Sequence, residues 1–343
     1  MTANGHLIDA NTRHQIYLQR YASGSSNKLV KHIKKAIKAA RARLNEDLSA
    51  FGTLRYRKQM RTLRTELESV YDDLGAAAQK ELTSFAEYEL GFNQRLLVAV
   101  VKPSVEVQAG SLAQLVSSAF ADVINLETDN ISIRGALREF TTKKAAQLVS
   151  EIEMGHSLGE TNTEISRRVR SVAEMQRRHA DTIVRTAVNH ISTSARNIVM
   201  DANADLLEGW QWLSTLDGRT TPICRARDGR IYPLDSDVRP PAHYGCRSTI
   251  TPVIKPEYAR EVKGSERAAN GAEGPGTVSS KTTYQTWLKQ QPAAFQREVL
   301  GATRYNLFAK GDLTLDKFVD SQGHTLSLDQ LRQREPQAFE RIQ

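Results

Sequence analysis

The chain has 343 residues, of which 40% are hydrophobic, 25% charged and 6% aromatic, and its net charge is +8. This balance favours helices with solvated faces over a β-sandwich, and the length accommodates two or three domains. It has no apolar run of the roughly 20 residues that cross a bilayer, no signal-peptide pattern, and too few cysteines for a disulfide framework. We therefore expect a soluble, unsecreted, helix-rich protein made in a reducing compartment.

The positive charge is concentrated near the N-terminus. Residues 13–64 contain fourteen Lys and Arg residues against two acidic residues, Glu46 and Asp47, so this segment has a net charge of +12 and the rest of the chain −4. A segment of this kind attracts polyanions through counterion release, and nucleic acid is its commonest partner. The alternative is a solvated helix face that serves only solubility.

Two long helices are predicted in this region. From Lys28, apolar residues recur at steps of three and four and mark one helix face, made of Ile33, Ile37, Ala40, Leu44, Leu48 and Phe51. The cationic residues of the same helix predict a DNA-binding surface made of Lys31, Lys34, Lys35, Lys38, Arg41 and Arg43. A second apolar row consists of Met60, Leu63, Leu67, Val70, Leu74 and Ala77. With a turn at Gly52, the two rows predict a helical hairpin or short coiled coil.

Helical patterns continue beyond the hairpin. Residues 79–150 are predicted to be mostly helical. Thr161, followed three residues later by Glu164, forms a capping box, which indicates a helix N-terminus. One long helix is then predicted from the helical spacing of Ile183, Ala187, Ile191 and Ile198.

The periodicity then changes from helical to alternating. Residues 209–215 and 248–254 are predicted as strands, with turns at Asp217-Gly218 and Asp228-Gly229 between them. Residues 263–283 contain four glycines and almost no large apolar residue, which predicts a flexible linker. We therefore predict an α+β, predominantly helical fold in four parts: a basic helical region 1–150, a small domain 151–262 with a short antiparallel sheet and an irregular Cys/His loop, the linker 263–283, and a C-terminal helical extension 284–343.

Both cysteines lie between the two predicted strands. Cys224, His243 and Cys246 form a candidate metal site, with Asp217 as a potential fourth ligand, because thiolate and imidazole are preferred zinc ligands. The C-x18-H-x2-C spacing has one close ligand pair where a secure zinc motif has two. A disulfide, a catalytic thiol served by His243, and a buried turn cluster without chemistry are the alternatives that the residues leave open.

An ordered series of motifs in this part of the chain resembles the F-like domain of phage Mu and the related minor head, or head morphogenesis, proteins of tailed phages. The likeness covers roughly residues 155–335. The matching positions are Arg185 and Thr186 on a helix, Asp217, Arg219 and Thr220 in a turn, Cys224, Asp228 and Gly229 after it, then Pro240, Pro241 and His243, and finally Cys246 and Arg247. The chain departs from the family at Thr221 and Ser248, where other members often have cysteines. Two potential metal ligands are therefore missing.

The resemblance implies a structural protein of the virion that is not an enzyme. It implies few copies inside the capsid, bound to the portal protein, with a role in head assembly and in DNA packaging or ejection. The host cytoplasm is its expected location during assembly, and the major capsid or scaffold protein is a further candidate partner. The basic helices contain no base-reading motif, so any contact with double-stranded DNA is expected at the phosphates.

Two enzyme hypotheses compete with this interpretation. A metal-dependent nuclease would use His243 with Asp217 or Asp228 to hold a metal and activate water. An ADP-ribosyltransferase would use Ser192-Thr193-Ser194 and Glu151-Ile152-Glu153, but the order of these motifs is reversed in this chain.

Overall fold

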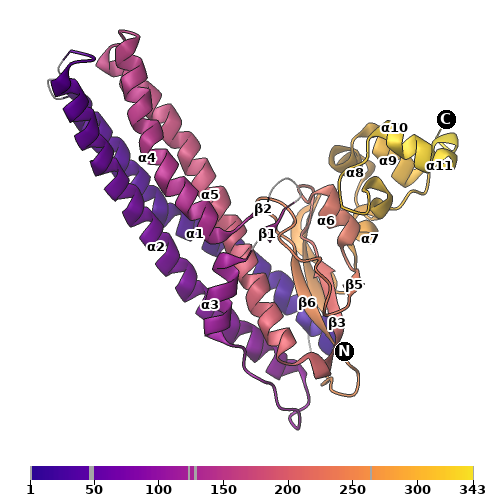
Figure 1. Ribbon diagram of the computed structural model, residues 1–343. Helices are drawn as coiled ribbons and strands as arrows, with labels where there is room; N and C mark the ends of the chain where they lie inside the picture. The colour runs from indigo at the N-terminus through magenta and orange to yellow at the C-terminus, as the bar shows by residue number, and fades with distance from the viewer. Residues whose placement is uncertain (1, 46–49, 123, 127–129, 263–264, 343) are drawn as a thin grey trace.

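The computed structural model describes residues 2–342 apart from 46–49, 123, 127–129 and 263–264. It shows a stalk of long helices, a small α+β module at one end of the stalk, and a group of short helices at the C-terminus (Figure 1). The predicted α+β fold, with long N-terminal helices and a short antiparallel sheet, is therefore confirmed. In the described part of the chain, no helix is long and apolar enough to cross a membrane.

Two helical hairpins form the stalk. The first consists of α1 (Ala3–Asn45) and α2 (Leu54–Val100), and the second of α4 (Ile133–Ser157) and α5 (Asn162–Asp201). Both α1 and α4 pack against α2 and α5, so the apolar faces of the four helices enclose a common core (Figure 1). The predicted capping box is present at the start of α5, where Thr161 and Glu164 bond reciprocally.

The apolar rows predicted for the first hairpin lie in this core. The buried members are Ile33, Ala40 and Leu44 on α1 and Met60, Leu63, Leu67, Val70 and Leu74 on α2, while Ile37 and Ala77 are half-buried and pack against them. Phe51 is an exception, because it lies in a turn and is 53% exposed. Leu48, like Glu46 and Asp47, lies outside the described residues.

The first helix is longer than its apolar pattern predicts, since α1 begins at Ala3 rather than near Lys28. Its first half turns several polar residues inward, which interrupts the apolar periodicity. Asn11 donates a hydrogen bond to the Thr251 hydroxyl over 3.0 Å, and the His14 ring meets the buried Glu89 carboxylate at 2.7 Å. These partners lie on distant elements, so the local sequence gives no signal for them.

The α+β module is built on the predicted antiparallel sheet. Strands β3 (Leu207–Leu213), β5 (Ile231–Tyr232) and β6 (Thr249–Ile254) pair in the order β5-β3-β6, with Trp212 opposite Ile250. The predicted strands at 209–215 and 248–254 correspond to β3 and β6. The other short elements are α3 (Leu112–Ala121), which packs on the stalk helices, β1 (Ile124–Asn125), β2 (Asn130–Ile131), η1 (Ala204–Leu206) and α6 (Pro222–Arg227).

The segment predicted as a linker forms a second sheet instead, which corrects that prediction. Strands β7 (Glu266–Gly271) and β8 (Gly274–Ser279) form a hairpin, and β4 (Leu216–Asp217) pairs in parallel with β7. Backbone hydrogen bonds need no large side chain, so glycine and alanine do not prevent pairing here. One long side chain in the segment, Arg267, is fully buried and fixes it to the module.

The C-terminal residues form a second hydrophobic core. It is assembled from α7 (Tyr284–Lys289), α8 (Ala293–Leu300), α9 (Ala302–Ala309), η2 (Leu315–Phe318), α10 (Leu328–Arg334) and α11 (Pro336–Glu340). Trp287, Leu288 and Phe308 are buried in it together with Leu216 of β4. The helical extension predicted from the sequence is thus packed against the second sheet.

Candidate metal centre

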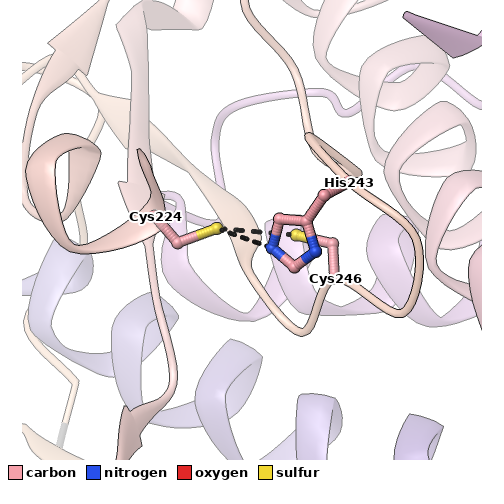
Figure 2. A group of neighbouring side chains, drawn as sticks. All are labelled: Cys224, His243 and Cys246. Atoms are coloured by element: carbon pink, nitrogen blue, oxygen red, sulfur yellow. Dashed lines mark hydrogen bonds between the residues drawn. The ribbon is translucent and has the colours of Figure 1, made fainter. Parts of the chain in front are cut away.

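The two cysteines and the histidine come from separate elements that meet at the edge of the main sheet. Cys224 lies in α6, whereas His243 and Cys246 lie in the loop that leads into β6. In Figure 2 the three side chains point toward one another. Helix α5 holds this loop in place, because Asn189 donates to the carbonyls of Cys246 and Ser248 and Thr186 accepts from the Gly245 amide.

Two of the three separations between ligand atoms match those of a tetrahedral zinc site. The two sulfurs lie 3.7 Å apart, Cys224 Sγ lies 3.4 Å from His243 Nε2, and all three atoms lie within 4.8 Å of one another. Zinc bonds of about 2.3 Å to sulfur and about 2.0 Å to nitrogen, at the tetrahedral angle, imply a sulfur–sulfur separation of about 3.8 Å and a sulfur–nitrogen separation of about 3.5 Å. The cysteines are free thiols. The Cys/His group can therefore hold a metal ion.

The histidine is oriented for coordination by a backbone carbonyl. His243 Nδ1 lies 3.0 Å from the Tyr244 carbonyl oxygen, which can only accept a hydrogen bond. Nδ1 must therefore hold the proton in the neutral ring, so Nε2 presents its lone pair to the sulfurs. Metal-bound histidines have this second hydrogen bond as a rule, because it fixes the tautomer and the ring.

The two thiols are electrostatically different. The hydrogen bond with Cys246, together with burial, raises the pKa of Cys224 well above its ordinary value. Burial alone would raise the pKa of Cys246 too, but the hydrogen bond with Cys224 and the interaction with His243 lower it. Cys246 is therefore the more readily ionised of the two thiols, and thiolate is the form that binds metals.

Asp217, the expected fourth ligand, is directed elsewhere. Both of its carboxylate oxygens are bound by Arg247, and Oδ1 also accepts from the Arg219 amide and the Thr220 hydroxyl. Across the residues that the structure describes, the metal-binding group contains only Cys224, His243 and Cys246. The prediction of Asp217 as a ligand is therefore wrong, because an arginine thirty positions away neutralises it.

A small cavity adjoins two of the three candidate ligands, Cys224 and His243. Its volume is about 100 Å³, and Thr221 and Ser248 line it. The Thr221 hydroxyl lies 2.9 Å from His243 Nε2. The resemblance implies cysteines in other family members at these two positions, and in this chain both positions lie beside the cluster.

Asp228 connects three segments beside the cluster. Its side chain is fully buried and accepts hydrogen bonds from the backbone amides of Ser214 and Tyr284, both over 2.6 Å. Arg267 binds the same carboxylate in a bidentate pair over 2.5 and 3.0 Å. Gly229 follows with a φ of +80°, a conformation that favours glycine, and donates to the Trp212 carbonyl.

The remaining motif residues also make structural contacts. Arg185 pairs with Asp181 on α5, Thr186 meets Gly245, and Pro241, in a cis peptide bond with Pro240, is buried beside the loop. Arg219 differs, because its side chain is 83% exposed.

The nuclease hypothesis requires a carboxylate beside His243, and among the described residues none joins its metal-binding group. Asp217 is occupied by Arg247 and Asp228 by Arg267, and neither belongs to the metal-binding group of the described residues. For the other enzyme hypothesis, Ser192-Thr193-Ser194 lie within helix α5. The geometry supports neither catalytic arrangement.

The predicted DNA-binding residues lie together on α1. Lys31, Lys34, Lys35, Lys38 and Arg41 are exposed, and Arg43 is half-exposed. Part of this charge is neutralised by α2, because Lys35 lies 3.7 Å from Asp73 and Arg43 lies 3.6 Å from Glu66. Exposed cations of α2, namely Arg55, Arg57, Lys58, Arg61 and Arg64, extend the basic surface.

The hydrogen bonds around the Cys/His cluster and Asp228 include two residues that the sequence analysis missed, Asn189 and Arg267. A polar residue on the apolar face of a predicted helix, as at Asn189, is a usable signal, because a buried amide requires partners. Arg267 gives no such signal, since its partner is 39 residues away in sequence.

Asp217 should make stability depend on pH. Burial alone would raise the pKa of this carboxyl, but Arg247, Thr220 and the Arg219 amide together hold it below its ordinary value. The resulting stabilisation is complete above the ordinary pKa of about 3.9 and is lost as pH falls through the lower folded-state pKa. Asp217→Asn should cost about 1–3 kcal/mol at pH 7 and less at pH 3, which lies below the ordinary pKa. Urea unfolding at pH 7 and pH 3 measures the cost, with the exposed Asp235→Asn as the control. An equal cost of Asp217→Asn at the two pH values would contradict the prediction.

The fold and the site define a class of protein: a long helical stalk joined to a small α+β module, in which polar motif residues form a hydrogen-bonded framework around a Cys/His cluster. Residues 146–251, which span the end of α4, α5 and most of the main sheet, match the family model described as Phage Mu protein F like protein. In this part the chain is therefore similar to the phage Mu F-like head morphogenesis proteins, a family of structural head proteins, as its motifs predicted. Comparisons with curated proteins and with solved structures give no match.

Proposed function

We propose that this protein is a minor capsid protein that is bound at the portal inside the head and takes part in head assembly and in DNA packaging or ejection. The observation that supports this most directly is the F-like module itself, in which the motif residues are used as structural supports. A rigid module with a long projecting stalk suits a protein that is held at a ring while it reaches into the head (Figure 1). Co-purification with the portal protein from the same genome tests the proposal.

The stalk is proposed to contact packaged double-stranded DNA. Cationic side chains from α1 and α2 gather on its distal half, and among the described residues Lys31, Lys34 and Lys38 have no ion-pair partner. Lysine point charges on a helix face contact phosphates without reading sequence. The contact should therefore be non-specific and sensitive to salt.

Reversing Lys31, Lys34 and Lys38 to glutamate should weaken DNA binding and its salt dependence. Each lost phosphate contact lowers the slope of log K against log salt by about 0.9, so the triple variant should lose roughly 2–3 from this slope. Fluorescence anisotropy with random-sequence duplexes from 50 to 200 mM salt is the measurement. A matched triple reversal of Lys281, Lys289 and Lys310, exposed in the C-terminal third, should bind like the unaltered protein. Equal binding by both variants would refute a role for α1.

The Cys/His group is proposed to hold zinc. Two sulfurs and one imidazole nitrogen at tetrahedral separations form a soft donor set, which zinc prefers to magnesium or calcium. The Tyr244 carbonyl supplies the outer hydrogen bond that a zinc-bound histidine needs. Cys224, His243 and Cys246 would bind the ion and tie α6 to the loop before β6.

A further inference from the structure

A second hollow lies between the first helix and the second sheet, and it shares Arg219 and Arg247 with the cavity beside the Cys/His cluster. Its volume is about 450 Å³. Helix α1 forms one wall with Thr12, Gln15 and Ile16, and the facing wall is formed by β4, β7 and β8. The facing residues are small, with Ala268, Ala269 and Gly276 among them, so the helix and the sheet do not close the space between them.

Gln15 points to a missing partner in this hollow. The residue is 6% exposed, yet neither the oxygen nor the nitrogen of its amide has a hydrogen-bond partner among the residues that the structure describes. Burying an amide without partners is unfavourable, and nearly all buried polar groups in native proteins are paired. A side-chain amide offers one donor group and one acceptor, which is the complement of a peptide group. An extended peptide segment therefore fits the position chemically.

An exposed apolar side chain lines the hollow. Ile16 is 44% exposed there. An apolar side chain that is exposed beside a hollow is available to pack against a docked partner. Arg219, whose side chain is 83% exposed, adds a positive charge to the lining. It accounts for a motif residue that supports no packing.

We propose that the portal protein docks in this hollow through an extended segment that places an apolar side chain between α1 and β7, a peptide group at Gln15 and a carboxylate at Arg219. The inference rests on the proposed association with the portal. The apolar residues exposed at the far end of the stalk, Leu54 and Leu158, lie on hairpin turns and make no contribution to the hollow. They serve as the control surface.

Binding of the full-length chain to the portal protein from the same genome, measured by biolayer interferometry, tests the proposal. Ile16→Glu places a charge at the apolar edge and should weaken binding by about tenfold or more. Gln15→Met keeps the volume but removes the amide. It should weaken binding while the melting temperature stays the same or rises, because a buried unpaired group is removed. If Gln15 had only a structural role, binding and the melting temperature would fall together. Leu54→Glu should bind like the unaltered protein.

The outcomes separate this inference from the proposed function. If the unaltered chain does not bind the portal protein, both are overturned. If the unaltered chain, Ile16→Glu and Gln15→Met bind equally well, the portal association stands and this docking site is wrong. If Leu54→Glu alone loses binding, the stalk tip is the docking surface instead. If circular dichroism shows that Ile16→Glu is misfolded, the binding of Gln15→Met decides whether the hollow is the docking site.

Discussion

Replacing Asp228 with asparagine is expected to destabilise the protein by about 3–5 kcal/mol, the usual cost of removing one partner of a buried ion pair. Asparagine keeps the shape, but its amide nitrogen cannot accept from Arg267 or from the backbone amides that the carboxylate now binds. A buried guanidinium would remain without a counter-charge. Because the carboxylate joins β3, β7 and the start of α7, the whole module should weaken together.

Urea unfolding followed by circular dichroism measures this effect. The control is Asp235→Asn, an exposed aspartate in the same module, which should change the free energy of unfolding by less than about 0.5 kcal/mol. Arg267→Met combined with Asp228→Asn should recover part of the loss, because the uncompensated charge is then removed. A cost below about 1 kcal/mol for Asp228→Asn would show that the pair does not hold the second sheet in place.

Zinc is expected to bind the Cys/His group with one ion per chain and to raise the thermal stability. Loss of a first ligand should be more damaging than the 10- to 100-fold losses seen for outer-shell partners, so Cys224→Ser should weaken binding by more than about a hundredfold. Cobalt is a suitable probe, because its absorption bands report tetrahedral geometry and thiolate ligation. The control is Thr215→Ser, which keeps the hydroxyl that donates to the Arg247 carbonyl and should bind like the unaltered protein.

The two cavity residues allow a gain-of-ligand test at the same site. Thr221→Cys or Ser248→Cys should add a third thiolate, tighten zinc binding and shift the cobalt spectrum toward three sulfur ligands, because both positions line the cavity beside the cluster. Failure of both variants to change the affinity would mean that the fourth coordination position faces elsewhere. No cobalt absorption in the unaltered protein would contradict the zinc proposal itself.

The long helices and the main sheet were predictable because their signals are local. Steps of three and four indicate the buried faces of α1 and α2. Alternation over a few residues indicated the strands β3 and β6, although β6 is buried at all six of its positions. The first half of α1 and the hairpin at 266–279 were not predictable in this way. Their burial depends on polar side chains, such as Asn11 and Arg267, whose partners lie hundreds or tens of residues away.

In the candidate site, too, local signals were predictable and distant partners were not. The convergence of Cys224, His243 and Cys246 followed from the order of motifs around the two strands, and the structure brings the three together. The role of Asp217 could not be read in advance, since a turn aspartate serves equally well as a metal ligand or as the partner of an arginine. Only the position of Arg247 decides between these roles.

We propose that this chain is a structural component of the phage head that sits at the portal with its stalk toward the DNA. An asymmetric electron-microscopy reconstruction of the mature particle tests this most directly. We predict density for the F-like module against the portal ring, with the four-helix stalk pointing into the packaged genome. A particle whose portal vertex contains no density for this chain would contradict the account.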